Sequence, residues 1–113
     1  MAPALQRLAN WAEENLVRIE LDLFQEFRPD DKRSHRHHTQ RVNELIRDWT
    51  RGLVLLGWCS DIDRRELGKI SAVLSKLRAD VERTWFDQAG REFVEQLARV
   101  ISDARNGLRE AVQ

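Results

Sequence analysis

Apolar residues recur every three or four positions along four stretches of the chain, and this spacing predicts four amphipathic helices. The first runs from about Pro3 to about Phe27, and the second ends near Gly57, a residue type common at helix C-termini. The third follows a short connection at 58–60, and the fourth follows an expected turn at 87–90. The predicted core positions are Leu5, Leu8, Ala12, Leu16, Ile19, Leu23, Phe27, Val42, Leu45, Ile46, Trp49, Leu53, Leu56, Leu67, Ile70, Leu74, Leu77, Val81, Trp85, Phe93, Leu97, Val100, Ile101, Ala104, Leu108 and Ala111.

Residues that stop or cap a helix predict where these helices begin and end. The first helix stops within 28–31, because the residue before a proline avoids the helical conformation. Asp30 or Asp31 is then expected to cap the second helix, and Ser60 or Asp61 the third, through a side-chain oxygen. Four helices with one apolar stripe each pack most simply as an antiparallel bundle. The sequence therefore predicts an all-α fold, an antiparallel bundle of about four helices.

The composition agrees with a single helical-bundle domain over residues 1–113. Hydrophobic residues make up 42% of the chain, which is enough apolar surface to offset the entropy lost on folding. The lone cysteine, Cys59, excludes an internal disulfide and favours a reducing, cytoplasmic location. The longest apolar run, 53–56, is too short to span a bilayer, so no membrane partner is expected.

Charge is distributed unevenly although the formal net charge is zero. Residues 1–27 hold two arginines against five acids, whereas residues 28–51 hold seven cations against four acids. Opposite its apolar stripe, the second helix carries Arg33, Arg36, Gln40, Asn43, Arg47 and Arg51, with Glu44 close by. The third helix carries Arg65, Lys69, Lys76 and Arg83, with only Asp80 near that row. The outer face of the fourth helix mixes both signs of charge.

These two basic rows have two interpretations. Cations one or two helical turns apart can follow a phosphate backbone, RNA or DNA, without reading its bases. Alternatively, the rows are ordinary solvated faces whose cations pair with nearby acids at helical spacing. Helix periodicity alone does not determine whether the two rows converge into one groove.

Large apolar residues also project from the first helix. Trp11 and Leu21 point away from its core stripe, and Val17 and Phe24 flank that stripe. Apolar groups on an outer face commonly contact a protein partner, although a wider buried stripe would account for them equally well. Trp11 and Leu21 are therefore candidate protein-interface residues.

The segment from Ser34 to His38 is the one concentration of metal-capable side chains in the sequence. If a helix begins near Asp31, then Asp31, His35 and His38 share a face and could hold a metal, although no fourth ligand is apparent. Arg33 and His38 fit an R-x4-H pattern that resembles the signature of HEPN ribonucleases, helical bundles that act on RNA without metal. The favoured interpretation is that the histidines add weak charge and hydrogen bonding to the basic row, with no catalytic residue, metal or cofactor.

The remaining reactive and aromatic residues are expected to be structural. Cys59 has no adjacent histidine in sequence, and a small buried thiol is the usual outcome for such a residue. The residues Trp49, Trp58, Trp85 and Phe86 are expected to anchor the core, and Trp58 or Phe86 would be the ones left in solvent near a turn.

A small helical bundle with two basic helix faces, arginine-dominated cations and no catalytic motif resembles the small subunits of CRISPR effector complexes. That resemblance implies several copies along a multisubunit filament, contacts with neighbouring subunits, and nucleic-acid backbone held in a positive groove. It implies that the acidic first helix meets a neighbour and that the nucleic acid is faced by Arg33, Arg36, Arg47, Arg51, Lys69, Lys76 and Arg83. The alternative is a protein-interaction adaptor or immunity-type module, and a lesser one is a HEPN-like ribonuclease.

Overall fold

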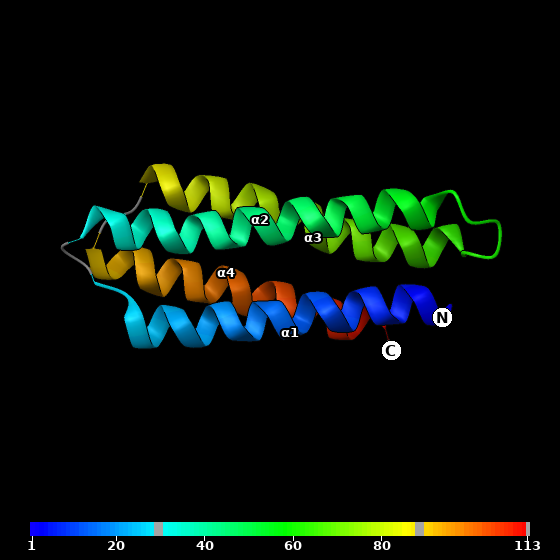
Figure 1. The fold of residues 1–113 in the computed structure, drawn as a ribbon, viewed down its shortest axis with the longest axis horizontal. Helices are drawn as coiled ribbons and strands as arrows, with labels where there is room; N and C mark the ends of the chain where they lie inside the picture. Colours follow the sequence, from blue (N-terminus) through cyan, green and yellow to red (C-terminus); the bar gives the residue numbers. More distant parts are fainter. Residues whose placement is uncertain (29–30, 88–89, 113) are drawn as a thin grey trace.

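The computed structural model is a bundle of four helices joined by short connections (Figure 1). The helices are α1 (Pro3–Glu26), α2 (Lys32–Gly57), α3 (Arg64–Asp87) and α4 (Gly90–Ala111). The structure describes residues 1–28, 31–87 and 90–112, and only the backbone of 85–87, 90 and 91. The prediction of an all-α bundle of four helices is confirmed. None of the helices in this described part is both long enough and apolar enough to cross a membrane.

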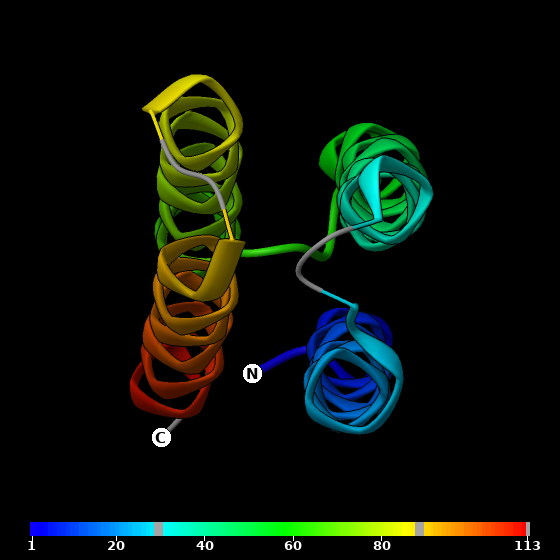
Figure 2. The ribbon, with the colours of Figure 1, turned by 90° about the vertical axis from the view of Figure 1, so that its left-hand side faces the viewer.

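Each helix runs antiparallel to the one before it, so α1 and α3 share one direction and α2 and α4 the other (Figure 1). Seen from the end, the helices occupy four corners, with α2 between α1 and α3 and with α4 between α3 and α1 (Figure 2). The neighbours that pack together are therefore α1 with α2, α2 with α3, α3 with α4, and α4 with α1.

One hydrophobic core runs through the bundle and takes residues from all four helices. Fully buried examples are Leu16 in α1, Trp49 in α2, Ile70 in α3 and Phe93 in α4. Every predicted core position with a described side chain is either buried or packed against this core. The side chains of the remaining two aromatic candidates, 85 and 86, lie outside the described residues.

Ion pairs join α1 to both of its neighbours. Arg41 of α2 pairs with Asp22, while on α4 Arg105 Nη1 lies 2.7 Å from Glu20 Oε2 and Arg109 Nε lies 2.6 Å from Glu13 Oε1. Three of the five acids of α1 are therefore neutralised inside the bundle. The acidic character that the sequence assigns to this helix is therefore largely offset by ion pairs with α2 and α4.

The helix caps agree with the sequence at α2 and differ at α3. Asp31 Oδ1 accepts a hydrogen bond from the backbone N–H of Arg33 (2.8 Å), so the expected cap at Asp31 is confirmed. The expected cap of α3 at Ser60 or Asp61 is wrong, because Asp63 Oδ1 accepts from the backbone N–H of Arg65 instead (2.8 Å). Ile62 is buried in the core, so the connection continues past it before α3 begins.

Trp58 and Cys59 are exposed: Trp58 does not anchor the core and is one of the aromatics left in solvent near a turn, and the expected burial of the Cys59 thiol is wrong. Trp58 is the C-terminal cap of α2, and it lies on the side of the helix opposite Trp49. The indole therefore stays in solvent, with 79% of its surface exposed.

Candidate nucleic-acid interface

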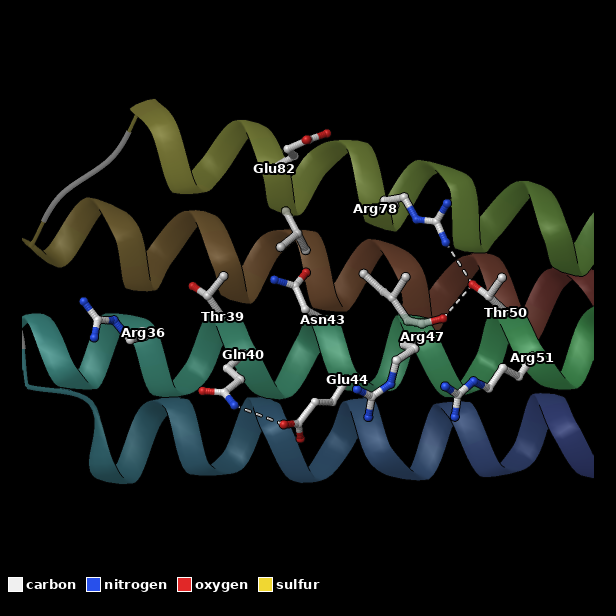
Figure 3. Close-up of a pocket in the computed structure, with 12 residues that line it drawn as sticks. Arg36, Thr39, Gln40, Asn43, Glu44, Arg47, Thr50, Arg51, Arg78 and Glu82 are labelled. Carbon is white, nitrogen blue, oxygen red and sulfur yellow. Dashed lines mark hydrogen bonds between the residues drawn. The ribbon is translucent and has the colours of Figure 1, made fainter.

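A hollow of about 990 Å³ lies between α2 and α3, and four arginines line it (Figure 3). Arg36, Arg47 and Arg51 come from α2, and Arg78 comes from α3. The other lining residues are Thr39, Gln40, Asn43, Glu44, Ile46, Thr50, Val81 and Glu82. Four cations and two acids thus line this surface, which we call the α2–α3 groove.

The arrangement of the groove follows from the helical repeat of α2. Its polar residues at 36, 40, 43, 47 and 51 are three or four positions apart, so they share one face opposite the buried stripe. Two buried side chains, Ile46 from α2 and Val81 from α3, form an apolar floor. The groove is therefore a rigid surface of two packed helices, with arginine side chains above hydrocarbon.

Three of the four arginines are available to bind an anion. Among the described residues, Arg36, Arg51 and Arg78 have no carboxylate partner. Arg78 Nη2 donates to Thr50 Oγ1 (2.9 Å), which fixes this guanidinium across the groove. Arg47 Nε lies 3.6 Å from Asp48 Oδ1, but both side chains are exposed, and such pairs contribute at most about 1 kcal/mol. A planar guanidinium without a carboxylate matches a phosphate bidentately.

The basic row that the sequence predicts on α3 lies outside this groove. None of its four residues lines the hollow. Lys76 Nζ lies 3.1 Å from Asp80 Oδ2 and 3.8 Å from Asp103 Oδ2 on α4, and Arg83 Nη2 lies 3.2 Å from Asp80 Oδ1. The row therefore faces the α4 side of the bundle, and Lys76 and Arg83 share one carboxylate. Arg65 and Lys69 are exposed, and whether any of these residues contacts nucleic acid stays a prediction.

Arg78 is the groove residue that the sequence interpretation missed. It follows the core residue Leu77 directly, so it lies at the edge of the apolar stripe and not in the outer row. Only the position of α2 beside that edge identifies Arg78 as a partner of the α2 arginines. Arg33, in contrast, is exposed near the start of α2 but does not line the hollow.

Two of the three histidines, His35 and His38, pack against aromatic side chains, whereas His37 is exposed. His38 is 1% exposed and its ring centre lies 5.8 Å from that of Phe27. His35 packs against Phe27 and Phe93, with ring centres 4.9 Å and 4.5 Å apart. The expectation that the histidines add charge to the row is therefore wrong for His38, whose Nδ1 has no hydrogen-bond partner.

Neither the metal site nor the ribonuclease pattern is assembled on the described surface. No group of three or more His, Cys, Asp or Glu side chains is placed to hold a metal ion within residues 1–28, 31–87 and 90–112. Arg33 is exposed while His38 is buried, so the two residues of the R-x4-H pattern do not share an accessible face. A catalytic histidine has to reach its substrate, and His38 does not.

Burial of His38 should make the stability of the protein depend on pH. Burial, with the nearby His37 and Arg41 charges, lowers the pKa of His38 below its ordinary value of about 6.5, and Glu26 and Asp22 partly oppose this. Because the unfolded chain binds a proton more readily, stability is complete above about pH 6.5 and is lost as the pH falls through the folded-state pKa.

Urea unfolding of the wild type and His38→Leu between pH 7.5 and 5 checks this expectation. The wild type should lose stability in acid faster than the variant, with a difference of at most about 1.4 kcal/mol per pH unit for one proton. Equal slopes for the two proteins would contradict it.

The outward projection of apolar residues from α1 is confirmed. Trp11, Leu21 and Phe24 are exposed, the last two to 53% and 63%. Leu21 and Phe24 are three residues apart, so they share one side of the helix. The apolar side chains of α1 are therefore exposed, and whether they contact a protein partner stays a prediction.

The fold and the groove together define a small antiparallel four-helix bundle with an arginine-lined surface between two helices. Comparison of the chain with protein-family models, with curated proteins and with solved structures gives no match. The functional argument therefore rests on the residues of the groove.

Proposed function

We propose that this protein is a non-catalytic subunit of a nucleoprotein assembly and that it holds nucleic-acid backbone in the α2–α3 groove. The observation that carries the proposal is the set of three guanidinium groups that have no carboxylate partner among the described residues, together with Arg47, around one hollow. Arg41, Arg105 and Arg109, in contrast, each pair with an acid of α1.

The dimensions of the groove suit a polymer better than a small anion. Arg36 and Arg51 are fifteen residues apart on one helix, which places them about 22 Å apart along its axis. A single phosphate contacts one of these positions, whereas a chain of phosphates reaches several. The groove also presents the amides of Gln40 and Asn43, groups that hydrogen-bond to phosphate and sugar without specifying sequence.

The small number of cations in the groove supports a role within a larger assembly. Four arginines give a modest electrostatic contribution, and the formal net charge of the whole chain is zero. Several copies side by side, as the resemblance to CRISPR small subunits implies, would add their contacts along one strand and raise the overall affinity. The exposed strip of Leu21 and Phe24 provides an apolar surface for a neighbouring subunit.

Salt dependence of binding tests the proposal on the purified protein. A fluorescently labelled 20-nucleotide oligonucleotide is titrated with protein at 50 and 200 mM salt. Four phosphate contacts predict that the affinity for a single strand falls about 50-fold over this range, since each contact contributes about 0.7 to the salt exponent. An oligonucleotide of the same sequence with an uncharged methylphosphonate backbone is the control and should not bind. Absence of binding at 50 mM, or binding that salt leaves unchanged, would overturn the proposal.

A protein-interaction adaptor is the second candidate, because Leu21 and Phe24 are large apolar side chains left in solvent on α1. Such a strip is the usual centre of a protein interface. Copurification of a protein partner without nucleic acid, combined with no oligonucleotide binding at 50 mM salt, would favour this candidate.

A further inference from the structure

We infer that the α2–α3 groove takes single-stranded nucleic acid, with one base stacked on Trp58. This inference rests on the proposed function and adds the class of strand to it. Its evidence is a second hollow that continues the groove and ends at an exposed tryptophan.

The second hollow has a volume of about 420 Å³ and lies at the other end of the same helix pair. Thr50 and Arg78 line both hollows, so the two adjoin at the hydrogen bond that these residues make. The second hollow is lined further by Val54 and Trp58 of α2 and by Arg64 of α3. The surface therefore changes along its length from arginines and amides to an aromatic and an aliphatic side chain beside two arginines.

Trp58 belongs to the same face of α2 as the groove arginines. Arg47, Arg51, Val54 and Trp58 are spaced by four, three and four residues, and Trp58 keeps helical backbone angles as the cap of α2. Seven residues separate Arg51 from Trp58, which corresponds to about 10 Å along the helix axis. A strand whose phosphates contact Arg51 and Arg78 thus passes within reach of the indole.

Trp58 stays in solvent because it lies on the outer face of α2, at the end of the helix. The indole is 79% exposed, although the helix end that carries it is fixed by a hydrogen bond from its backbone N–H to Leu55 O (3.3 Å). A rigid backbone with an exposed flat side chain is the geometry of a stacking platform, which binds any base because every base has a π-face. In a duplex those faces are covered by neighbouring base pairs, so a platform beside a phosphate-binding groove selects unpaired strands.

The first test compares Trp58→Ala with the wild type on single-stranded and duplex oligonucleotides of equal length at 50 mM salt. Trp58→Ala should bind the single strand about 10-fold more weakly, a value within the range known for one base–aromatic stack, and should bind duplex as the wild type does. Trp58→Phe should recover most of the loss. Trp11→Ala removes an exposed tryptophan from α1 and is the matched control, with no expected change.

An oligonucleotide without bases gives a second, independent readout. A strand of abasic sites keeps every phosphate, so it should bind the wild type and Trp58→Ala equally, and about as weakly as Trp58→Ala binds the ordinary strand. Equal affinity of Trp58→Ala and the wild type for the ordinary strand would overturn the inference. Conversion of a wild-type dimer to a monomer by Trp58→Ala, without any change in strand affinity, would assign Trp58 to a protein interface and also overturn it.

Failure of this inference is distinct from failure of the proposed function. Suppose that the wild type binds in a salt-dependent manner, that Trp58→Ala binds as tightly as the wild type, and that the abasic strand binds as tightly as the ordinary strand. Only the stacking role of Trp58 is then overturned. If the wild type binds no oligonucleotide at 50 mM salt, both fall.

Discussion

Trp49→Ala should lower the free energy of unfolding by about 3–5 kcal/mol, the cost usual for removing a fully buried large aromatic side chain. Trp49 is completely buried in α2, in a core enclosed by only four helices, so its removal leaves a large cavity. Urea unfolding followed by circular dichroism measures the loss. In a chain of this size, such a loss approaches the whole stability of the fold.

Two variants show whether the loss comes from burial. Trp49 Nε1 is buried without a hydrogen-bond partner, so Trp49→Phe removes an unsatisfied donor and keeps most of the apolar volume. It should cost much less than Trp49→Ala. Trp11→Ala removes a tryptophan of the same size from the surface and should cost under about 1 kcal/mol. Equal losses for Trp11→Ala and Trp49→Ala would contradict the assigned core.

Replacing Arg36, Arg51 and Arg78 together by alanine should lower the affinity for a single strand about 100-fold at 0.1 M salt. Three phosphate contacts contribute about 2.1 to the salt exponent, and that contribution vanishes only near 1 M salt. These three arginines have no carboxylate partner among the described residues, so their removal breaks no ion pair of the fold. Fluorescence anisotropy measures the affinity, and thermal melting confirms that the variant is folded.

The matched control removes three cations from the other predicted surface. Arg65→Ala, Lys69→Ala and Arg83→Ala together change the net charge by the same amount but leave the groove intact. Their combined effect should be within about 3-fold, because exposed charges farther away than about 10 Å are largely screened at this salt concentration. A loss as large as that of the groove variant would extend the binding surface to the outer face of α3, one of the two rows that the sequence predicts.

The spacing of apolar residues predicts the fold well because the buried positions of each helix can be identified from that helix alone. Leu16, Trp49 and Phe93 are each three or four residues from other apolar positions, so they lie on the apolar face of their own helix and are buried. The groove depends on which helices are neighbours and on how they are rotated, and a single helix does not contain that information. The α2 arginines are found from their spacing, whereas Arg78 is found only when α2 is seen beside the edge of the α3 stripe.

Trp58 and His38 show the same limit of sequence-based prediction, because the first is exposed and the second is buried. A tryptophan near apolar residues is normally buried, but Trp58 lies beyond the last core layer and on the outer face. A histidine in a basic segment is normally solvated, but His38 falls on the inner side of α2 once that helix starts at Lys32. Whether each of these side chains is buried depends on which way α2 faces near its ends. The sequence pattern has few apolar positions there from which that direction can be predicted.

The ion pairs of α1 have a consequence for how precisely the bundle is assembled. An apolar stripe that repeats every three or four residues fits its neighbours almost equally well after a slide of one turn, about 5.4 Å. After such a slide, Glu13, Glu20 and Asp22 would all lose their present arginines, and most of these charges would be left unpaired at partly covered contacts between helices. The three ion pairs therefore favour one axial register of α1 relative to both α2 and α4, which the repeating apolar stripe alone specifies less strongly.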